Sequence, residues 1–533
     1  MLRISQIKIS IDEPIEKVKE LVLKRLRISE KDLLDYRIYK ESIDARRAGR
    51  IDFIYTVDVA LKNEEKYLDK KYKQISLAPE LTYKQPNIGQ KKMLHRPVVI
   101  GFGPAGMFAA LLLAQMGYRP IVLERGQAVD ERVKAIDEFW TKGKLNPKSN
   151  VQFGEGGAGT FSDGKLTSRV RDLRSRKVLE EFVLAGAPED ILFKAHPHVG
   201  TDLLRGIVKN IRQQVIELGG EVRFESQVEE FVIENKQLQA IKLATGEEIK
   251  ANHAILAIGH SARDTFSELF NKGVTLTAKP FAVGVRIEHP QELIDKAQYK
   301  EFAGHPRLGA AEYRLTFKAS NGRGVYTFCM CPGGLVVPSA SEEGRLVTNG
   351  MSEHARDKAN ANSGLLVQVF PEDFPSDSPL AGVEFQRQLE SKAFELAGGN
   401  YQAPAQLVGD FLDGKASTEL GEVKPSYSLG IKLTDLHELF PDWISTAMEE
   451  AIVGLDHKLK GFAKTDAVLT GVESRSSSPV RINRDDESLQ SISTKGIYPS
   501  GEGAGFAGGI VSAAIDGLKC AESLISEFSR PEL

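Results

Sequence analysis

The stretch 97–126 most constrains the fold of this chain. It consists of a short apolar run, a glycine turn, an apolar helix and a second apolar run, and the turn comprises Gly101, Phe102, Gly103, Pro104, Ala105 and Gly106. Three glycines at this spacing allow a tight turn, close approach of a pyrophosphate and close packing of the helix on a sheet. The helix begins beneath the phosphates, where its free N–H groups favour negative charge. Because Glu124 lies where an acid can accept hydrogen bonds from a ribose, the stretch predicts a dinucleotide-binding βαβ unit.

Length and composition indicate an ordinary soluble protein of several domains. The chain has 533 residues, of which 41% are hydrophobic and 27% charged, and its formal net charge is -3. We therefore expect roughly two to four domains and no dedicated polyanion-binding role. The first residues show no signal-peptide pattern, and no window has the ~18 consecutive apolar residues of a membrane-spanning helix. Three cysteines are too few for a disulfide framework, which favours a cytoplasmic location.

The pattern of apolar runs and breaks divides the chain into four segments. Residues 1–90 are predicted to form a small α+β domain, with a ferredoxin-like arrangement as its model, and a charged linker. Residues 91–273 are predicted to be the first part of a Rossmann-type α/β domain, and residues 466–533 its C-terminal part. Residues 274–465 have a mixed pattern, which indicates an inserted α+β domain that contacts the substrate or caps the site.

The βαβ unit is followed by a second glycine-rich segment and by short strand-like runs. The glycine-rich segment covers 154–166, and a helix is expected from about 201 to 218, where two glycines end it. The runs Val222–Ile233, Leu238–Leu243 and Glu248–Ile258 are separated by turn residues. They predict an antiparallel meander rather than further βαβ units.

Four segments occur in an order that is typical of one group of flavoproteins. They are Gly101–Gly106 with Glu124-Arg125-Gly126, then Gly154–Leu166, then Ala257-Ile-Gly259, and finally Gly501-Glu502 with Gly508-Gly509-Ile510. In these segments the chain resembles FAD-dependent oxidoreductases of the glutathione-reductase-like superfamily and, more closely, the bacterial group of uncharacterised FAD-dependent dehydrogenases. The resemblance covers roughly residues 95–533 and implies a discontinuous FAD-binding domain with non-covalently bound FAD. The N-terminal unit is typical of the narrower group.

The resemblance also implies roles for individual residues. Val228 would meet the adenine through its backbone, and Gly259 would let the chain pass close to the cofactor. Glu502 would accept a hydrogen bond from the ribityl chain, where many relatives have aspartate. Gly508 and Gly509 would begin a helix whose positive end faces the pyrimidine edge of the flavin, where it stabilises developing negative charge.

The acid at position 124 also bears on the choice of cofactor. An acid suits a free ribose hydroxyl, whereas a 2′-phosphate would require a cation. Arg125 follows directly, but Glu124 holds the diagnostic position. No second complete glycine–acid unit is present in the sequence, so a stable second dinucleotide site is not expected. NAD(P)H stays open as a transient electron donor.

Three residues are the catalytic candidates. Cys329 and Cys331 flank one methionine, and on a strand both thiols would point to one face with their Cα atoms about 6.6 Å apart. That separation is near the upper limit for a disulfide. One interpretation is a redox dithiol or a flavin-adjacent thiol, and the other is that both cysteines are small buried apolar residues. Arg475 either holds an anionic group of the substrate or forms a structural salt bridge.

The segment 159–166 nearly matches a phosphate-binding loop of nucleotide hydrolases. Leu166 stands where such a loop needs a hydroxyl residue for magnesium, so the sequence excludes a nucleotide hydrolase. The polar residues of this segment are expected near the cofactor or the substrate instead, namely Thr160, Ser162, Asp163 and Lys165. An exposed ion pair between Asp163 and Lys165 is the alternative.

A basic run supports a second hypothesis on function. It consists of Arg169, Arg171, Arg174, Arg176 and Lys177. An FAD-dependent RNA-modifying or RNA-binding protein would use such a run, although charge runs are more often a solvated helix face, and nucleic-acid binding is not expected at this net charge. His196 and His198 lack the further ligands of a metal site, so no metal is predicted. The leading prediction is an FAD-dependent oxidoreductase that passes a hydride or electrons between a small molecule and the flavin.

Overall fold

A five-stranded parallel sheet lies at the centre of the α/β part of the molecule. The computed structural model describes residues 1–47, 49–68, 73–167 and 172–532. The strands run in the order β23-β11-β5-β6-β7, and all neighbours are parallel. They are β5 (Val98–Ile100), β6 (Ile121–Leu123), β7 (Glu221–Arg223), β11 (Ala254–Leu256) and β23 (Ile497–Pro499). Numbered along the chain, this is the order 3-2-1-4-5 of a doubly wound sheet, which places a ligand at the carboxyl ends of β5 and β11.

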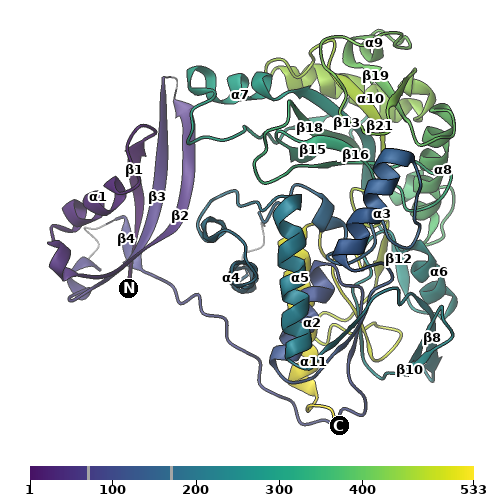
Figure 1. The fold of residues 1–533 in the computed structure, drawn as a ribbon, viewed down its shortest axis with the longest axis horizontal. Coiled ribbons are helices and arrows are strands. Elements are labelled where there is room, and N and C mark those ends of the chain that lie inside the picture. Colours follow the sequence, from purple (N-terminus) through teal and green to yellow (C-terminus); the bar gives the residue numbers. More distant parts are fainter. Residues whose placement is uncertain (48, 69–72, 168–171, 533) are drawn as a thin grey trace.

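Helices cover this sheet and bury its apolar strands. α2 (Pro104–Gln115) is buried along nearly its whole length, from Ala105 to Ala114. It packs against α11 (Ile510–Glu527) and α5 (Thr201–Glu217), and these helices lie side by side in Figure 1. Their buried side chains join those of α4 (Arg174–Leu184) in one apolar cluster. A helix with an apolar residue at every position needs neighbours on all sides, which explains why α2 is central.

The predicted meander is present, and its outer runs extend into the parallel sheet. It consists of β8 (Val228–Glu234), β9 (Gln237–Leu243) and β10 (Glu248–Lys250), all antiparallel. The predicted strand 222–233 is in fact two strands, because the chain turns at Glu225, whose φ is 53°. Its first part is β7 of the parallel sheet. The predicted run 248–258 likewise divides into β10 and β11.

The N-terminal unit, residues 1–77, lies apart from the parallel sheet at one side of the molecule (Figure 1). Its antiparallel sheet has the order β2-β3-β1-β4. The elements are β1 (Leu2–Ser10), α1 (Lys17–Leu26), β2 (Leu33–Arg47), β3 (Arg50–Leu61) and β4 (Ile75–Leu77). An extended segment then runs to the opposite end of the molecule, where Gly89 donates a backbone hydrogen bond of 2.8 Å to Ile525 of α11.

A seven-stranded mixed sheet forms the core of the inserted domain. Its order is β14-β15-β18-β13-β21-β19-β20, and only β19 and β20 are parallel. The strands are β13 (Phe281–Pro290), β14 (Thr316–Lys318), β15 (Gly324–Cys331), β18 (Asn360–Val369), β19 (Ala403–Leu407), β20 (Ile431–Leu433) and β21 (Val468–Glu473). This sheet therefore continues past residue 465.

Further elements pack around the sheets or connect them. β12 and β22 pair with each other where the chain enters and leaves the inserted domain. These elements are α3 (Val129–Lys142), α6 (Arg263–Asn271), α7 (Gln291–Tyr299), α8 (Ala381–Leu396), α9 (Val408–Leu412), α10 (Asp442–Asp456), β12 (Leu276–Ala278), β16 (Leu335–Pro338), β17 (Thr348–Met351) and β22 (Val480–Ile482). The prediction of a mixed α/β chain with parallel and antiparallel sheets is confirmed. Within the described ranges, no helix has the length and apolar character needed to cross a membrane.

The contact between α2 and α11 depends on a glycine. A methyl group on Gly517 would lie 2.0 Å from the carbonyl oxygen of Ala105, whereas a methyl group on Gly206 of α5 would meet nothing within 4 Å. We expect Gly517→Ala to lower the free energy of unfolding by roughly 1–3 kcal/mol, because the helices must move apart. The matched variant Gly206→Ala should leave it unchanged or raise it by up to about 1 kcal/mol. Denaturant unfolding measures both, and equal effects would contradict this packing.

Candidate functional site

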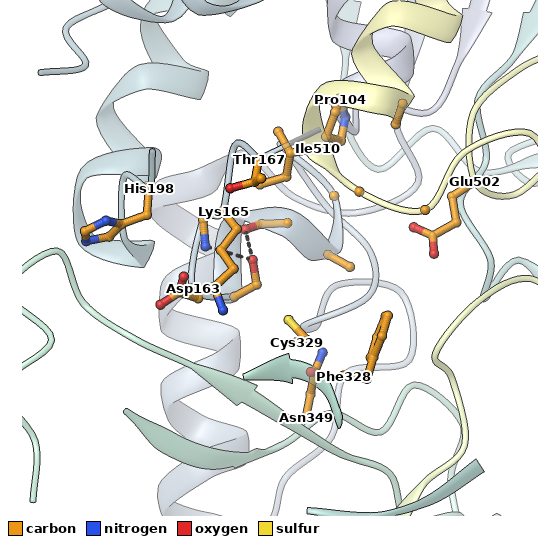
Figure 2. Close-up of a pocket in the computed structure, with 18 of the residues that line it drawn as sticks. Pro104, Asp163, Lys165, Thr167, His198, Phe328, Cys329, Asn349, Glu502 and Ile510 are labelled. Carbon is orange, nitrogen blue, oxygen red and sulfur yellow. Dashed lines mark hydrogen bonds between the residues drawn. The ribbon is translucent and has the colours of Figure 1, made fainter. Parts of the chain in front are cut away.

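A cavity of about 1110 Å³ lies at the carboxyl ends of β5 and β11. Three parts of the chain contribute to its wall: the parallel sheet with its loops, the inserted domain and the N-terminal unit. Figure 2 shows the part of the wall where Glu502 and Ile510 lie across from Phe328, Cys329 and Asn349. The cavity thus lies at the switch point of the sheet, where doubly wound folds bind their ligands.

The glycine turn forms the first wall of the cavity, and its conformation requires glycine. Gly101 has φ of 95°, and a methyl group on it would lie 2.3 Å from the carbonyl oxygen of Ala257. A methyl group on Gly106 would lie 1.9 Å from the carbonyl oxygen of Gly101. Gly103 caps α2, and Pro104 occupies its first turn, so the free N–H groups of a helix start here, as expected for a pyrophosphate site.

Glu124 holds this turn together. Its carboxylate accepts backbone N–H groups from Phe102 at 2.9 Å, from Gly126 at 2.9 Å and from Gly154 at 3.0 Å. A carboxylate offers about four acceptor positions, so three donors leave room for a ribose hydroxyl. Glu124 lines the cavity and is 5% exposed. The acid therefore shapes the site and also remains able to meet the ribose.

The adenine end of the predicted site is built from the residues that follow. Val228, at the start of β8, lines the cavity, as do Ala257 and Gly259. Gly259 has φ of 71°, in the left-handed region that favours glycine. Arg125 also lines the cavity, but its guanidinium donates to Asp264 at 3.0 Å and stacks over the ring of Phe153.

The start of α11 forms the flavin end of the predicted site. Gly508, Gly509 and Ile510 line the cavity, and α11 begins at Ile510 with its N-terminus there. Glu502 also lines it, and burial raises the pKa of this carboxyl to about 7, with Lys279 acting in the opposite direction. Gly501 lies behind, and its N–H donates to Asp516 at 2.7 Å.

The second glycine-rich segment contributes Ser162, Asp163 and Lys165 to the wall. The alternative of an ion pair between Asp163 and Lys165 is wrong. Asp163 binds Arg356 with two hydrogen bonds, of 3.1 and 2.5 Å, and Lys165 donates to the carbonyl of Met330 and lies 3.7 Å from Glu312. We call the wall formed by the glycine turn and the start of α11 the FAD-type wall, because the cofactor is predicted to lie there. Both charges connect this wall to the inserted domain.

Six predicted site residues do not line the cavity. They are buried behind its wall or shape the turn, namely Phe102, Gly106, Gly126, Thr160, Gly501 and Cys331. The Thr160 carbonyl accepts a hydrogen bond of 2.6 Å from the Thr201 hydroxyl, so this residue supports the loop from inside. Their places in the motifs were recognisable from the sequence, but the sequence did not show which of them reach the cavity.

The cysteine pair lies on an irregular part of β15. A bulge falls between Phe328 and Cys331, and Cys329 has φ of 42°, so the alternation on which the prediction of a shared face rested is interrupted. Cys329 lines the cavity, whereas Cys331 is fully buried and donates its thiol to the Cys329 carbonyl at 3.3 Å. Both thiols are free, and Figure 2 shows the Cys329 sulfur pointing into the cavity.

The neighbouring Cys331 thiol and nearby positive charges make the Cys329 thiol acidic. Cys331 lowers the pKa of the Cys329 thiol to about 6, and the charges of Arg286 and Lys165 offset part of the opposing cost of burial. The same contact raises the pKa of Cys331. Thiolate character at neutral pH is what a reactive cysteine needs.

Arg286 is a site residue that the sequence analysis missed. It is fully buried on β13 and donates to the Cys329 carbonyl at 2.8 Å, to Asn349 at 3.0 Å and to Glu473 at 2.9 Å. Burial raises the pKa of Glu473 to about 7, although its pairing with Arg286 works against this rise. The sequence did contain an indication of this role. Arg286 and Glu288 interrupt an apolar strand, and buried charges in such a strand need partners.

Arg475 lines the cavity but is already paired. Its guanidinium donates twice to Glu390, at 3.0 Å each, and once each to Ser261 and Ser341. Arg263 binds the same carboxylate at 2.7 and 2.9 Å. Burial alone would raise the pKa of Glu390, but the two guanidinium groups hold it well below its usual value. The structure therefore shows the salt-bridge alternative, and the candidacy of Arg475 as a substrate-binding group is corrected.

The basic run does not form a free cationic face in the described part of the chain. Arg174 binds Glu522 and Asp172, while Arg176 pairs with Glu180 and Lys177 with Glu181. The remaining two, Arg169 and Arg171, lie outside the described residues. Across the described ranges, no group of three or more His, Cys, Asp or Glu side chains could hold a metal ion.

The buried ion-pair group around Glu390 predicts a large effect on stability. We expect Glu390→Gln to lower the free energy of unfolding by about 3–5 kcal/mol, because it removes the buried carboxylate that two guanidinium groups share and leaves them only Glu342. Glu384→Gln, which removes an exposed partner of Arg387, should change it by less than about 1 kcal/mol. Denaturant unfolding measures both. If both variants change the free energy of unfolding by similarly small amounts, the position of Arg475 does not depend on its ion pair with Glu390.

Comparison with known proteins identifies the family. A family model described as "FAD-dependent protein, C-terminal domain-like" matches residues 280–476, and a model of a domain of unknown function matches residues 1–60. An uncharacterized protein of Clostridium beijerinckii is 52% identical over 533 residues, which is 100% of both chains.

Two solved structures are among the matches at low similarity. Glycine oxidase from Bacillus cereus is 10% identical, with 81% of this chain and 98% of that chain covered and a TM-score of 0.34. L-proline dehydrogenase from P. horikoshii is 12% identical, with 82% and 94% covered and a TM-score of 0.33. Both TM-scores are too low for these resemblances to carry the assignment.

The family match confirms the predicted FAD cofactor. Nothing in the comparisons supports the RNA-binding alternative. The residues of the cavity fit this cofactor, because its wall offers the glycine turn with Glu124 and the N-terminus of α11 in one space. With its relative matched over the full length of both chains, the protein belongs to this family of FAD-dependent proteins.

Proposed function

We propose that the protein is a glutathione-reductase-like oxidoreductase that transfers a hydride or electrons between a small molecule and FAD in the cavity at β5 and β11. When bound, FAD supplies redox chemistry that side chains do not supply. The observation that carries the proposal is the position of Cys329, which faces the cavity across from the start of α11 (Figure 2). A wall that suits the cofactor and a wall with a reactive thiol thus enclose one space.

The parallel sheet supports the finer assignment of the fold. Its 3-2-1-4-5 order and the three-stranded meander between β7 and β11 agree with a glutathione-reductase-like FAD domain. The inserted mixed sheet then supplies the surface opposite the cofactor.

We also propose a cytoplasmic location, since all three cysteines are free. We further propose NAD(P)H as a transient electron donor.

Two groups near Cys329 can hold a proton close to neutral pH. The pKa of the Cys329 thiol is lowered to about 6, chiefly by the neighbouring Cys331, and burial raises the pKa of Glu473 to about 7. Arg286 touches both residues and fixes their orientation. Groups with pKa values near the working pH are the most effective general acids and bases. We therefore assign Cys329 as the candidate catalytic group and Arg286 as its positioning residue.

FAD binding can be tested at a position that the fold tolerates. Gly508 lines the cavity, and a methyl group on it would meet nothing within 4 Å. Gly508→Val should therefore fill the cofactor space, weaken FAD binding at least about tenfold, or about 1.4 kcal/mol, and leave the melting temperature of the apo-protein unchanged. Calorimetric titration with FAD measures the affinity. An unchanged affinity would place the cofactor elsewhere, and a wild-type chain that does not bind FAD would overturn the proposal.

The acidity of Cys329 predicts a distinct pH profile. Iodoacetamide should alkylate Cys329 with a midpoint near pH 6, which follows the pKa of its thiol, whereas Cys331 and Cys520 should react slowly because they are buried. In Cys331→Ala the midpoint should move upward, since the neighbouring thiol that lowers the pKa of Cys329 is lost. FAD should slow the reaction if the thiol faces the cofactor. Peptide mass spectrometry follows each site, and a midpoint near the ordinary value of about 8.5 would contradict the assignment.

A further inference from the structure

The cavity extends from the FAD-type wall to the N-terminal unit. We call this outer part the outer chamber. It is lined by Ser42 and Ile43 of β2, Phe53 of β3, and residues of the segments 194–198 and 298–314. The N-terminal unit, which lies apart from the parallel sheet in Figure 1, thus contributes directly to the wall of the site.

Specific contacts fix the N-terminal unit in this position. The backbone of Glu41 pairs with the segment after α4, through hydrogen bonds of 2.7 Å to Phe193 and 2.9 Å from Ala195. Arg307, from the inserted domain, donates to the Ile11 carbonyl at 2.9 Å and stacks over the ring of Phe53 at 4.2 Å. These contacts join three parts of the chain, so the outer chamber is a built cavity rather than a gap between domains.

The outer chamber and the adjoining wall carry an excess of positive charge among the described residues. The acids are fewer than the cations, and most of the acids are already paired. The cations are Lys165, Lys194, Arg307, Arg314 and Arg356, and the acids are Glu41, Asp163 and Glu312. Glu312 serves two groups at once, since it lies 2.8 Å from His196 and 3.7 Å from Lys165. Its hydrogen bond raises the pKa of His196.

Arg314 is the cation that remains free to bind a ligand. It lines the cavity, and it makes no ion pair or hydrogen bond with any described residue. The other cations have partners, as Arg356 binds Asp163 and Lys194 binds Asp190. A guanidinium group presents paired donors that match a carboxylate or a phosphate.

We propose that the outer chamber binds an anionic group of the substrate, with Arg314 as its main contact and the N-terminal unit as part of the substrate site. This inference rests on the proposed oxidoreductase function, because it concerns the substrate of the same cavity. The substrate class is a small organic anion with a carboxylate or a phosphate. The apolar side chains of Ile43 and Phe53 offer contact to the carbon part of such a molecule.

Binding of small probes to the FAD-loaded full-length chain tests this. Benzoate and phenyl phosphate carry the two anionic groups, and benzamide is the neutral isostere of benzoate. Calorimetry should show at least one anion binding about tenfold or more tightly than benzamide, as expected for charge-assisted hydrogen bonds. Which of the two anions binds more tightly then tells carboxylate from phosphate. Equal binding of the anions and benzamide, or no binding of either anion, would overturn the inference.

Two pairs of variants separate a specific contact from a general charge effect. Arg314→Gln should weaken anion binding about tenfold or more, whereas Lys318→Gln, an equal loss of charge outside the cavity, should change it less than about twofold. Ile43→Asp should weaken it through repulsion, whereas the neutral Ile43→Asn should not. Equal effects within either pair would overturn the inference. FAD content is measured on each sample: a wild-type chain without FAD refutes the proposed function and this inference with it, whereas a loaded chain without anion preference refutes the inference alone.

Discussion

The hydrogen bonds of the Glu124 carboxylate are the interaction on which the proposed FAD site depends. This carboxylate accepts backbone N–H groups from the turn after β5, from the loop after β6 and from the second glycine-rich segment. Hydrogen bonds from neutral donors to a buried charge are about twice as strong as neutral ones, and an unpaired buried carboxylate would be very costly. One side chain therefore holds three loops in the arrangement that a pyrophosphate and a ribose require. The glycines of the turn permit this approach, but Glu124 fixes it.

A second buried charge organises the opposite wall in a similar way. Arg286 lies inside the mixed sheet, and its donors reach Cys329, Asn349 and Glu473. Buried ion pairs contribute little net stability compared with apolar packing, but they favour one arrangement because breaking them leaves an uncompensated charge. Arg286 contacts the bulge in β15 through its hydrogen bond to the Cys329 carbonyl. Rigidity on both walls is what a redox site needs to hold a substrate against a cofactor.

Much of the nucleotide-binding part was predictable, because its signals are local. The glycine spacing, the apolar helix and the acid at position 124 all lie within 30 residues, and each has one physical explanation. The meander was also predictable, but not the division of its outer runs between two sheets, since a turn at Glu225 has no strong sequence signal. The role of Arg475 could not be decided, because its partner Glu390 lies 85 residues earlier in the chain. Contacts at such separations depend on the tertiary fold.

The same limit applies to the substrate side of the cavity. Arg314 and Ile43 are unremarkable in the sequence, and only the fold brings them to one chamber. Arg286 interrupts an apolar strand, and the periodicity of apolar residues alone does not indicate the role of such a buried charge. The cysteine pair shows the converse, because a regular strand was a sound expectation and the bulge changed which thiol reaches the cavity. The proposed function therefore depends on residues that are placed by long-range packing.

Equilibrium binding of FAD, FMN and ADP to the apo-protein tests the central claim most directly. If the four segments form one site for the whole dinucleotide, calorimetry will show one FAD per chain, bound more tightly than either FMN or ADP, because each of these occupies only part of the cavity. If FMN binds as tightly as FAD, the wall around Glu124 and Val228 does not hold the adenosine half. If none of the three binds, the account of this cavity is wrong.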